Sequence, residues 1–198
     1  MLTLSDVMCT GHHAAVSAGV KEGDVVCVVG DGAVGLCAII AARRLGARRI
    51  IAMSRNPSRQ RLAQTFGATD IVSERGDDAV KIVMDMTNGI GVDAALECVG
   101  TGESMNTAFG VARPGAIVGA IGAPHGVVVP IDKVIFRDIG LRGGVSPVRR
   151  YIPELIDDVL EGRINPGLVF DYVTDLDGIK QAYIEMDERR AIKALLRP

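Results

Sequence analysis

The sequence is poor in the residues that mark several classes of protein. It has no tryptophan, only 4% aromatic residues, and four scattered cysteines (Cys9, Cys27, Cys37 and Cys98) without a C-x-x-C pair. A disulfide framework or a structural zinc knuckle is therefore not expected, and a reducing cytoplasm is the predicted compartment. No apolar run is long enough to span a bilayer, and the first residues lack the basic start of a signal peptide.

The chain also lacks an excess of either charge. Its 22 Lys and Arg against 24 Asp and Glu give a net charge of −2, so neither nucleic acid nor an anionic membrane is expected as a partner. Hydrophobic residues make up 48% of the 198 residues, which is enough for a folded protein with one full core.

One motif dominates what is present. The apolar segment Val25–Val29 runs directly into Gly30-Asp31-Gly32-Ala33-Val34-Gly35, which has the spacing G-x-G-x-x-G and is followed by a helical pattern. Such glycines allow a tight turn, close approach of a pyrophosphate, and packing of helix on strand. The helix N-terminus then offers unpaired N–H groups to phosphates. The motif predicts dinucleotide binding by Gly30, Gly32, Ala33, Val34 and Gly35.

Short Val- and Ile-rich segments alternate with helical patterns, which is typical of a parallel α/β sheet. We expect helices near Val34–Leu45, Pro57–Phe66, Asp77–Met86 and Ser104–Ala112. The expected strands are Val25–Val29, Ile50–Met53, Asp70–Val72, Asp93–Glu97, Ala116–Ile121 and Ile139–Arg142. Right-handed crossovers then predict a doubly wound Rossmann domain over residues 1–146, with a six-stranded parallel sheet in the order 3-2-1-4-5-6.

The composition changes after about Gly144. Tyr151–Glu161 and Asp177–Glu188 each carry apolar residues at helical spacing, and Ala191–Leu196 has the character of a closing strand. These elements fit no βαβ unit. We therefore expect residues 147–198 to form a separate, largely helical C-terminal segment that packs on another part of the protein.

The end of the second strand indicates the cofactor. An NAD-binding fold places an acid there for the ribose hydroxyls, but this sequence has none and instead offers Ser54, Arg55 and Arg59. A hydroxyl and two guanidinium groups suit a 2′-phosphate. This pattern favours NADP(H) over NAD(H), and it also disfavours S-adenosylmethionine. The alternative is that Arg55, Arg59 and Arg61 form only a solvated helix face.

The order of these motifs resembles the cofactor domain and C-terminal segment of the medium-chain, zinc-dependent alcohol dehydrogenase family. Ser54-Arg55 is similar to the NADP-preferring branch of that family. The segments that carry the resemblance are Asp6–Ala14, Gly23–Gly35, Phe66–Asp70, Gly91–Gly100 and Arg113–Gly122.

The resemblance implies hydride transfer between an alcohol and an aldehyde or ketone, with zinc as a Lewis acid and NADP(H) as the hydride carrier. Asp6 matches the third zinc ligand of one branch, whereas the Cys and His ligands have no match. We expect them on an N-terminal catalytic domain that precedes Met1 and that residues 147–198 would complete. This chain alone is therefore predicted neither to hold zinc nor to turn over alcohols efficiently. As an alternative, Asp6 is the N-cap of the helix after it. His12, His13 and His125 are expected to be packed or surface residues.

Further cofactor contacts are expected at the carboxyl ends of later strands. Val99 and Gly100 follow the fourth strand, Gly122 and Ala123 the fifth, and Gly143 the sixth. Thr10 resembles a position beside the nicotinamide. The alternative for each glycine is an ordinary turn, and Thr10 has a structural alternative in its helix.

Strand Ile139–Arg142 is predicted to lie at an edge of the sheet, where unpaired backbone groups favour pairing. Since the resembling family pairs this edge across a two-fold axis, we expect a homodimer. Two other functions remain open. One is a non-catalytic NADP(H)-binding module whose C-terminal segment binds a partner, and the other is a zinc-free, quinone-reductase-like oxidoreductase.

Overall fold

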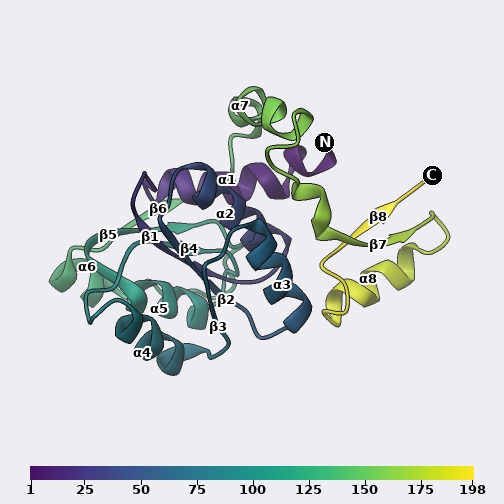
Figure 1. Cartoon of the computed structure of the whole chain (residues 1–198). Helices are drawn as coiled ribbons and strands as arrows, with labels where there is room; N and C mark the ends of the chain where they lie inside the picture. The colour runs from purple at the N-terminus through teal and green to yellow at the C-terminus, as the bar shows by residue number, and fades with distance from the viewer.

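A six-stranded parallel sheet forms the centre of the computed structural model, which describes residues 1–198 (Figure 1). The strand order is β3-β2-β1-β4-β5-β6, with all neighbours parallel, so the predicted doubly wound Rossmann fold is confirmed. The strands are β1 (Val25–Val29), β2 (Arg49–Met53), β3 (Asp70–Val72), β4 (Val92–Glu97), β5 (Ala112–Ala120) and β6 (Gly140–Gly143).

Helices cover both faces of this sheet. One core packs the sheet against α1 (Val7–Ser17), α2 (Ala33–Arg44) and α3 (Pro57–Phe66), and a second packs it against α4 (Gly76–Met86) and α5 (Gly102–Val111). Along β1, Val26 and Val28 enter the first core, whereas Cys27 and Val29 enter the second. Burial on both faces explains why the strand is continuously apolar. No helix combines the length and apolar character that crossing a membrane requires.

Local signals in the sequence fix the start and end of α3. The Asn56 side chain accepts hydrogen bonds from the backbone N–H groups of Ser58 (2.9 Å) and Arg59 (3.4 Å), and Pro57 occupies the first turn. The helix ends at Gly67, whose φ of 118° favours glycine. These caps set where the chain leaves β2, and so they position the residues that follow this strand.

The C-terminal segment is less helical than predicted. It contains the expected helices α7 (Val148–Leu160) and α8 (Ile179–Asp187) and the expected strand β8 (Lys193–Leu196). It also contains β7 (Phe170–Thr174), which pairs in parallel with β8 as a separate two-stranded sheet. Strand β7 and the short helix α6 (Ile131–Arg137) are absent from the prediction. Helix α6 spans only seven residues, which is too short for a helical period to be recognised in the sequence.

This segment contacts the Rossmann part through α7. Tyr151 and Leu155 of α7 enter the same core as α1 and α2, and Arg44 pairs with Glu154 and Asp158 beside them. The unit of β7, α8 and β8 lies to one side of the sheet (Figure 1). A short 3₁₀ helix, η2 (Pro166–Val169), leads into it, and another, η1 (Leu2–Ser5), precedes α1.

Candidate cofactor site

In the turn between β1 and α2, each of the three glycines is required or tolerated for a different structural reason. Gly30 has φ 120°, and a Cβ atom there would lie 2.7 Å from Val99 Cγ2. A Cβ on Gly35 would lie 2.0 Å from the Gly30 carbonyl oxygen, so only glycine lets α2 pack this closely on the turn. Gly32 has no atom within 4 Å of such a Cβ and is the N-cap of α2. Open space therefore adjoins the N–H groups of the first turn of α2, as a bound phosphate requires.

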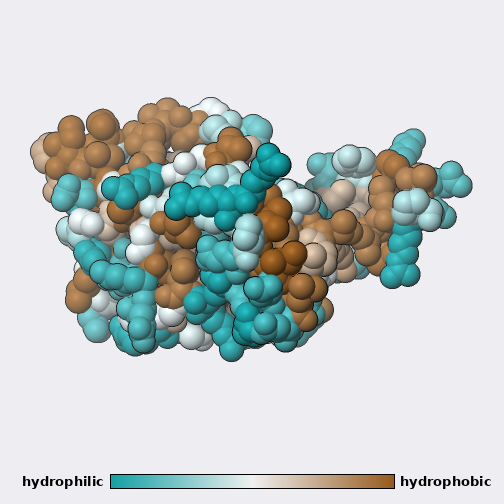
Figure 2. All heavy atoms as spheres, turned by 90° about the horizontal axis from the view of Figure 1, so that it is seen from above, coloured by the Kyte–Doolittle hydropathy of each residue, from teal (hydrophilic) through white to brown (hydrophobic).

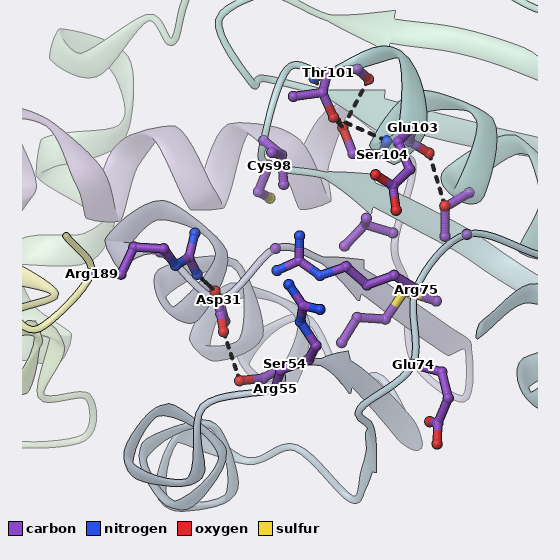
Figure 3. A pocket seen from close by; sticks show the side chains of 17 residues that line it. Asp31, Ser54, Arg55, Glu74, Arg75, Cys98, Thr101, Glu103, Ser104 and Arg189 are labelled. Carbon is purple, nitrogen blue, oxygen red and sulfur yellow. Dashed lines mark hydrogen bonds and ion pairs between the residues drawn. The ribbon is translucent and has the colours of Figure 1, made fainter. Parts of the chain in front are cut away.

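A cleft of about 260 Å³ opens beside this turn. Its walls are the ends of β1, β2, β3 and β4 and the start of α5, and Figure 3 shows the side chains that line it. Among the residues predicted from the sequence, those that line the cleft are Gly30, Gly32, Ser54, Arg55 and Val99. Those absent from the sequence prediction include Asp31, Glu74, Arg75, Gly76, Cys98, Thr101, Glu103, Ser104 and Arg189.

Two arginines from neighbouring strand ends point into the cleft. Arg55 follows β2, Arg75 follows β3, and their guanidinium groups lie near each other in Figure 3. No hydrogen bond or ion pair holds either guanidinium group. Two converging cations repel each other unless an anion lies between them, and a guanidinium group is well suited to phosphate oxygens. Because β3 is the neighbour of β2 in the predicted sheet order, the sequence contained the signal for Arg75.

A carboxylate lies next to these cations. Asp31, in the glycine-rich turn, is 7% exposed, and its Oδ2 accepts a hydrogen bond from Ser54 Oγ at 2.8 Å. Its Oδ1 pairs with Arg189 of the C-terminal segment and lies 3.6 Å from Arg59 Nη1. The cleft therefore combines free cations on one side with a partly compensated carboxylate on the other.

Arg59 lies outside the cleft and has partners of its own. Its guanidinium group donates to the carbonyl oxygens of Asp31 (3.1 Å), Ala191 (2.9 Å) and Arg189 (3.3 Å). It is buried, and burial lowers its pKa. The structure thus gives Arg59 a different role from the predicted contact with a 2′-phosphate, because it joins the glycine-rich turn to the C-terminal segment.

The other predicted cofactor residues do not line the cleft. Thr10 Oγ1 donates to the Asp6 carbonyl oxygen within α1. A Cβ on Gly122 would lie 2.2 Å from Gly100 N, and one on Gly143 would lie 1.8 Å from the Ala120 carbonyl oxygen. Gly100 and Gly122 thus allow the loops after β4 and β5 to pack backbone against backbone, and Gly143 allows the same close approach between the ends of β5 and β6. The residues outside the cleft are Thr10, Ala33, Val34, Gly35, Gly100, Gly122, Ala123 and Gly143.

Asp6 does not meet other metal ligands in this structure. It occupies the N-cap position of α1, but its side chain makes no capping hydrogen bond, so the predicted capping role is wrong. Instead its Oδ2 accepts a hydrogen bond from Lys193 Nζ at 3.1 Å. The structure has no group of three His, Cys, Asp or Glu placed to hold a metal, so the residues of this chain do not by themselves fit a catalytic zinc ion.

The histidines are placed as packed or surface residues. His12 is fully buried and meets Tyr151 edge-on at 4.8 Å between ring centroids. His13 Nδ1 lies 2.9 Å from Tyr151 Oη, and His125 is exposed in the loop after β5.

Comparison with known proteins agrees with this architecture. The model of a family described as zinc-binding dehydrogenase matches residues 33–161. A probable zinc-binding alcohol dehydrogenase of Mycobacterium tuberculosis is 35% identical, over 100% of this chain and 51% of its own length. The NADP-dependent isopropanol dehydrogenase of Thermoanaerobacter brockii is 33% identical, over 98% of this chain and 57% of its own length.

A solved structure shows the same arrangement. Alcohol dehydrogenase TADH from Thermus sp. ATN1 superposes with a TM-score of 0.91 at 31% identity, over 99% of this chain and 57% of that chain. The chain spans about half the length of the curated relatives it matches. The fold, the glycine-rich turn and these matches together show that the chain belongs to the zinc-binding dehydrogenase family and contains its cofactor-binding domain.

Proposed function

We propose that this chain binds NADP(H) as the cofactor-binding portion of a zinc-type alcohol dehydrogenase. The observation that carries the proposal is the convergence of Arg55 and Arg75 in the cleft beside Gly32, with no anionic partner for either guanidinium group. A 2′-phosphate supplies that anion. The relative from Thermoanaerobacter brockii, which is named as NADP-dependent, supports the same cofactor.

In this proposal the adenosine half of the cofactor fills the cleft. The pyrophosphate lies over Gly32 and the first turn of α2, where Ala33, Val34 and Gly35 present backbone N–H groups. Arg55 and Arg75 bind the 2′-phosphate together with Ser54, while Val99 contacts the ribose. The nicotinamide half runs towards Thr10, Gly100, Gly122, Ala123 and Gly143. When bound, NADP(H) supplies or accepts the hydride in the exchange between an alcohol and an aldehyde or ketone.

Substrate turnover requires groups that these residues do not provide. Asp6 is a single carboxylate paired with Lys193, so we propose that zinc and the alcohol or carbonyl substrate are held mainly by a catalytic domain outside residues 1–198. We expect the purified chain with added zinc and NADP⁺ to leave 2-propanol unoxidised. Zinc-dependent production of NADPH under these conditions contradicts this part of the proposal.

We also propose that the chain forms a homodimer through β6. This strand lies at the sheet edge, and large hydrophobic residues around it are exposed, including Phe136 at 86%. The others near this end are Val128, Ile131, Ile135, Leu141 and Val145. Hydrophobic side chains gather at the same end of the molecule in Figure 2. Light scattering at micromolar concentration is expected to give twice the mass of the chain, and a monomer contradicts the pairing.

The cofactor proposal is tested by removing one charge at a time. Arg55→Ala and Arg75→Ala are each expected to weaken NADPH binding about tenfold, roughly 1.4 kcal/mol, and to leave NADH binding nearly unchanged. Arg61→Ala is the matched control, because Arg61 is exposed on α3 and does not line the cleft. Isothermal titration calorimetry measures each dissociation constant. Equal losses for the two nucleotides in Arg55→Ala and Arg75→Ala contradict a 2′-phosphate contact.

A further inference from the structure

An acid reaches the end of β2 from a different element of the fold. Strand β2 is followed by Ser54 and Arg55, neither of which is acidic. Asp31, at the first variable position of the glycine-rich turn, nevertheless accepts the hydrogen bond of Ser54 Oγ at 2.8 Å. Its side chain is almost fully buried and lines the same cleft as Arg55 (Figure 3). A carboxylate is therefore present where dinucleotide-binding folds recognise the adenosine ribose.

The two forms of the cofactor differ at this point. A ribose with a free 2′-hydroxyl has a hydrogen to donate, and a carboxylate accepts it. A 2′-phosphate has no such hydrogen, and its negative charge is repelled by the carboxylate. Ser54 has only one hydroxyl hydrogen, so it cannot donate to Asp31 and to a phosphate oxygen at the same time. Asp31 thus favours NAD(H), whereas Arg55 and Arg75 favour NADP(H).

The C-terminal segment modifies the charge on Asp31. Arg189 pairs with Oδ1 of Asp31, and the Arg189 side chain is 53% exposed. Arg59 lies further from the same oxygen, at 3.6 Å, and is held by backbone carbonyl groups. Arg189 is therefore the partner that can move without disturbing the core, and its presence reduces the repulsion between Asp31 and a bound phosphate.

We propose that Asp31 sets how strongly this chain discriminates between NADP(H) and NAD(H), and that Arg189 offsets its charge. The inference rests on the proposed function and extends it, because it makes the chain able to bind both nucleotides with a moderate preference for NADP(H). Neither residue is needed for the glycine-rich turn to form, since backbone conformation and close packing determine that turn.

The test compares the ratio of the NADH and NADPH dissociation constants in several variants of the full chain. Asp31→Asn keeps the size of the side chain and is expected to raise the preference for NADPH about tenfold. Arg189→Gln is expected to lower it about threefold. In the Asp31→Asn background, Arg189→Gln is expected to have little effect, because Arg189 acts through Asp31.

Asp85→Asn is the matched control, since Asp85 is exposed on α4, does not line the cleft, and loses the same charge. An unchanged ratio in Asp31→Asn overturns the proposal, and so does an equal rise in Asp85→Asn. If Arg189→Gln changes the ratio as much in the Asp31→Asn background as in the unaltered chain, Arg189 does not act through Asp31. If Asp31→Asn does not fold, the exposed Arg189→Gln decides by the direction of its shift. Binding of neither nucleotide by the unaltered chain instead contradicts the proposed function itself.

Discussion

The two halves of the proposed cofactor crevice differ in what lines them: charged side chains in one half and closely packed backbone in the other. The adenosine half is lined by charged side chains, namely Arg55, Arg75 and Asp31, around open space at Gly32. The nicotinamide half is made of loops in which Gly100 and Gly122 pack backbone against backbone. Substitutions in the first half should therefore change nucleotide binding, and substitutions in the second should change whether the fold is stable.

The largest expected effect comes from adding a methyl group to each half. Gly122→Ala places a Cβ 2.2 Å from Gly100 N, and such overpacking typically destabilises a protein by about 1–3 kcal/mol. The Cβ added by Gly32→Ala meets no atom within 4 Å. This variant is expected to change the free energy of unfolding by less than about 0.5 kcal/mol while weakening the binding of both nucleotides. Chemical denaturation and calorimetric titration of both variants measure the two effects. Equal destabilisation by the two changes removes the distinction between the halves.

The next effect concerns Arg55 and Arg75, the two neighbouring cations of the adenosine half. The double variant Arg55→Ala/Arg75→Ala is expected to lose the preference for NADPH and to bind NADH more tightly than NADPH, a change of more than about tenfold in the ratio of the two dissociation constants. The reason is that no unpaired cation then remains beside Ser54. Calorimetry with both nucleotides measures the ratio. A preference that survives in the double variant assigns the phosphate to other residues.

Salt is expected to change the affinities for NADPH and NADH by different amounts, and this difference is smaller than the effects above. The NADPH contact with Arg55 and Arg75 involves exposed charges, which salt screens over about 10 Å at 0.1 M. Raising the ionic strength is therefore expected to weaken NADPH binding more than NADH binding. A parallel loss for both nucleotides indicates that the salt-sensitive contact is the shared pyrophosphate.

The smallest effect is a pH dependence at the contact between α1 and α7, where His12 meets Glu154 and Tyr151. Burial lowers the pKa of His12 below 6.5, against the opposing effect of Glu154 and with that of Arg44 and His13. The folded state therefore favours neutral His12, and its contribution to stability is present above pH 6.5 and is lost as the pH falls below it. His12→Gln is expected to flatten the pH dependence of the unfolding free energy between pH 5 and pH 7, roughly the range in which histidine titrates. An unaltered slope contradicts a buried neutral His12.

The sheet was predictable because each of its signals is local. Apolar strands such as Val25–Val29, the glycine spacing after them and caps such as Asn56 and Gly67 each specify one element, and handedness fixes the order. Strand β7 was missed because none of its five residues is fully buried, so no continuous apolar run marks it in the sequence. Residues 147–198 were predicted to complete a domain outside this chain. Their contact with the core of α1 and α2 through Tyr151 and Leu155 carries no local signal in the sequence.

The side chains of the cleft were predicted only in part. Ser54 and Arg55 follow β2 directly, so the position of the strand identified them. Arg59 is equally basic, but its direction on α3 takes it to the carbonyl oxygens of Asp31 and Ala191. Arg189 lies far along the chain from the glycine-rich turn, and only the folded C-terminal segment brings it to Asp31.

Titration of the unaltered chain with NADPH and with NADH decides whether Arg55 and Arg75 make this cleft an NADP(H) site. We expect both nucleotides to bind and NADPH to bind about tenfold more tightly, a difference of roughly 1.4 kcal/mol. Equal affinity, or tighter binding of NADH, contradicts this expectation, because Asp31 and not the two arginines then determines which cofactor the cleft accepts.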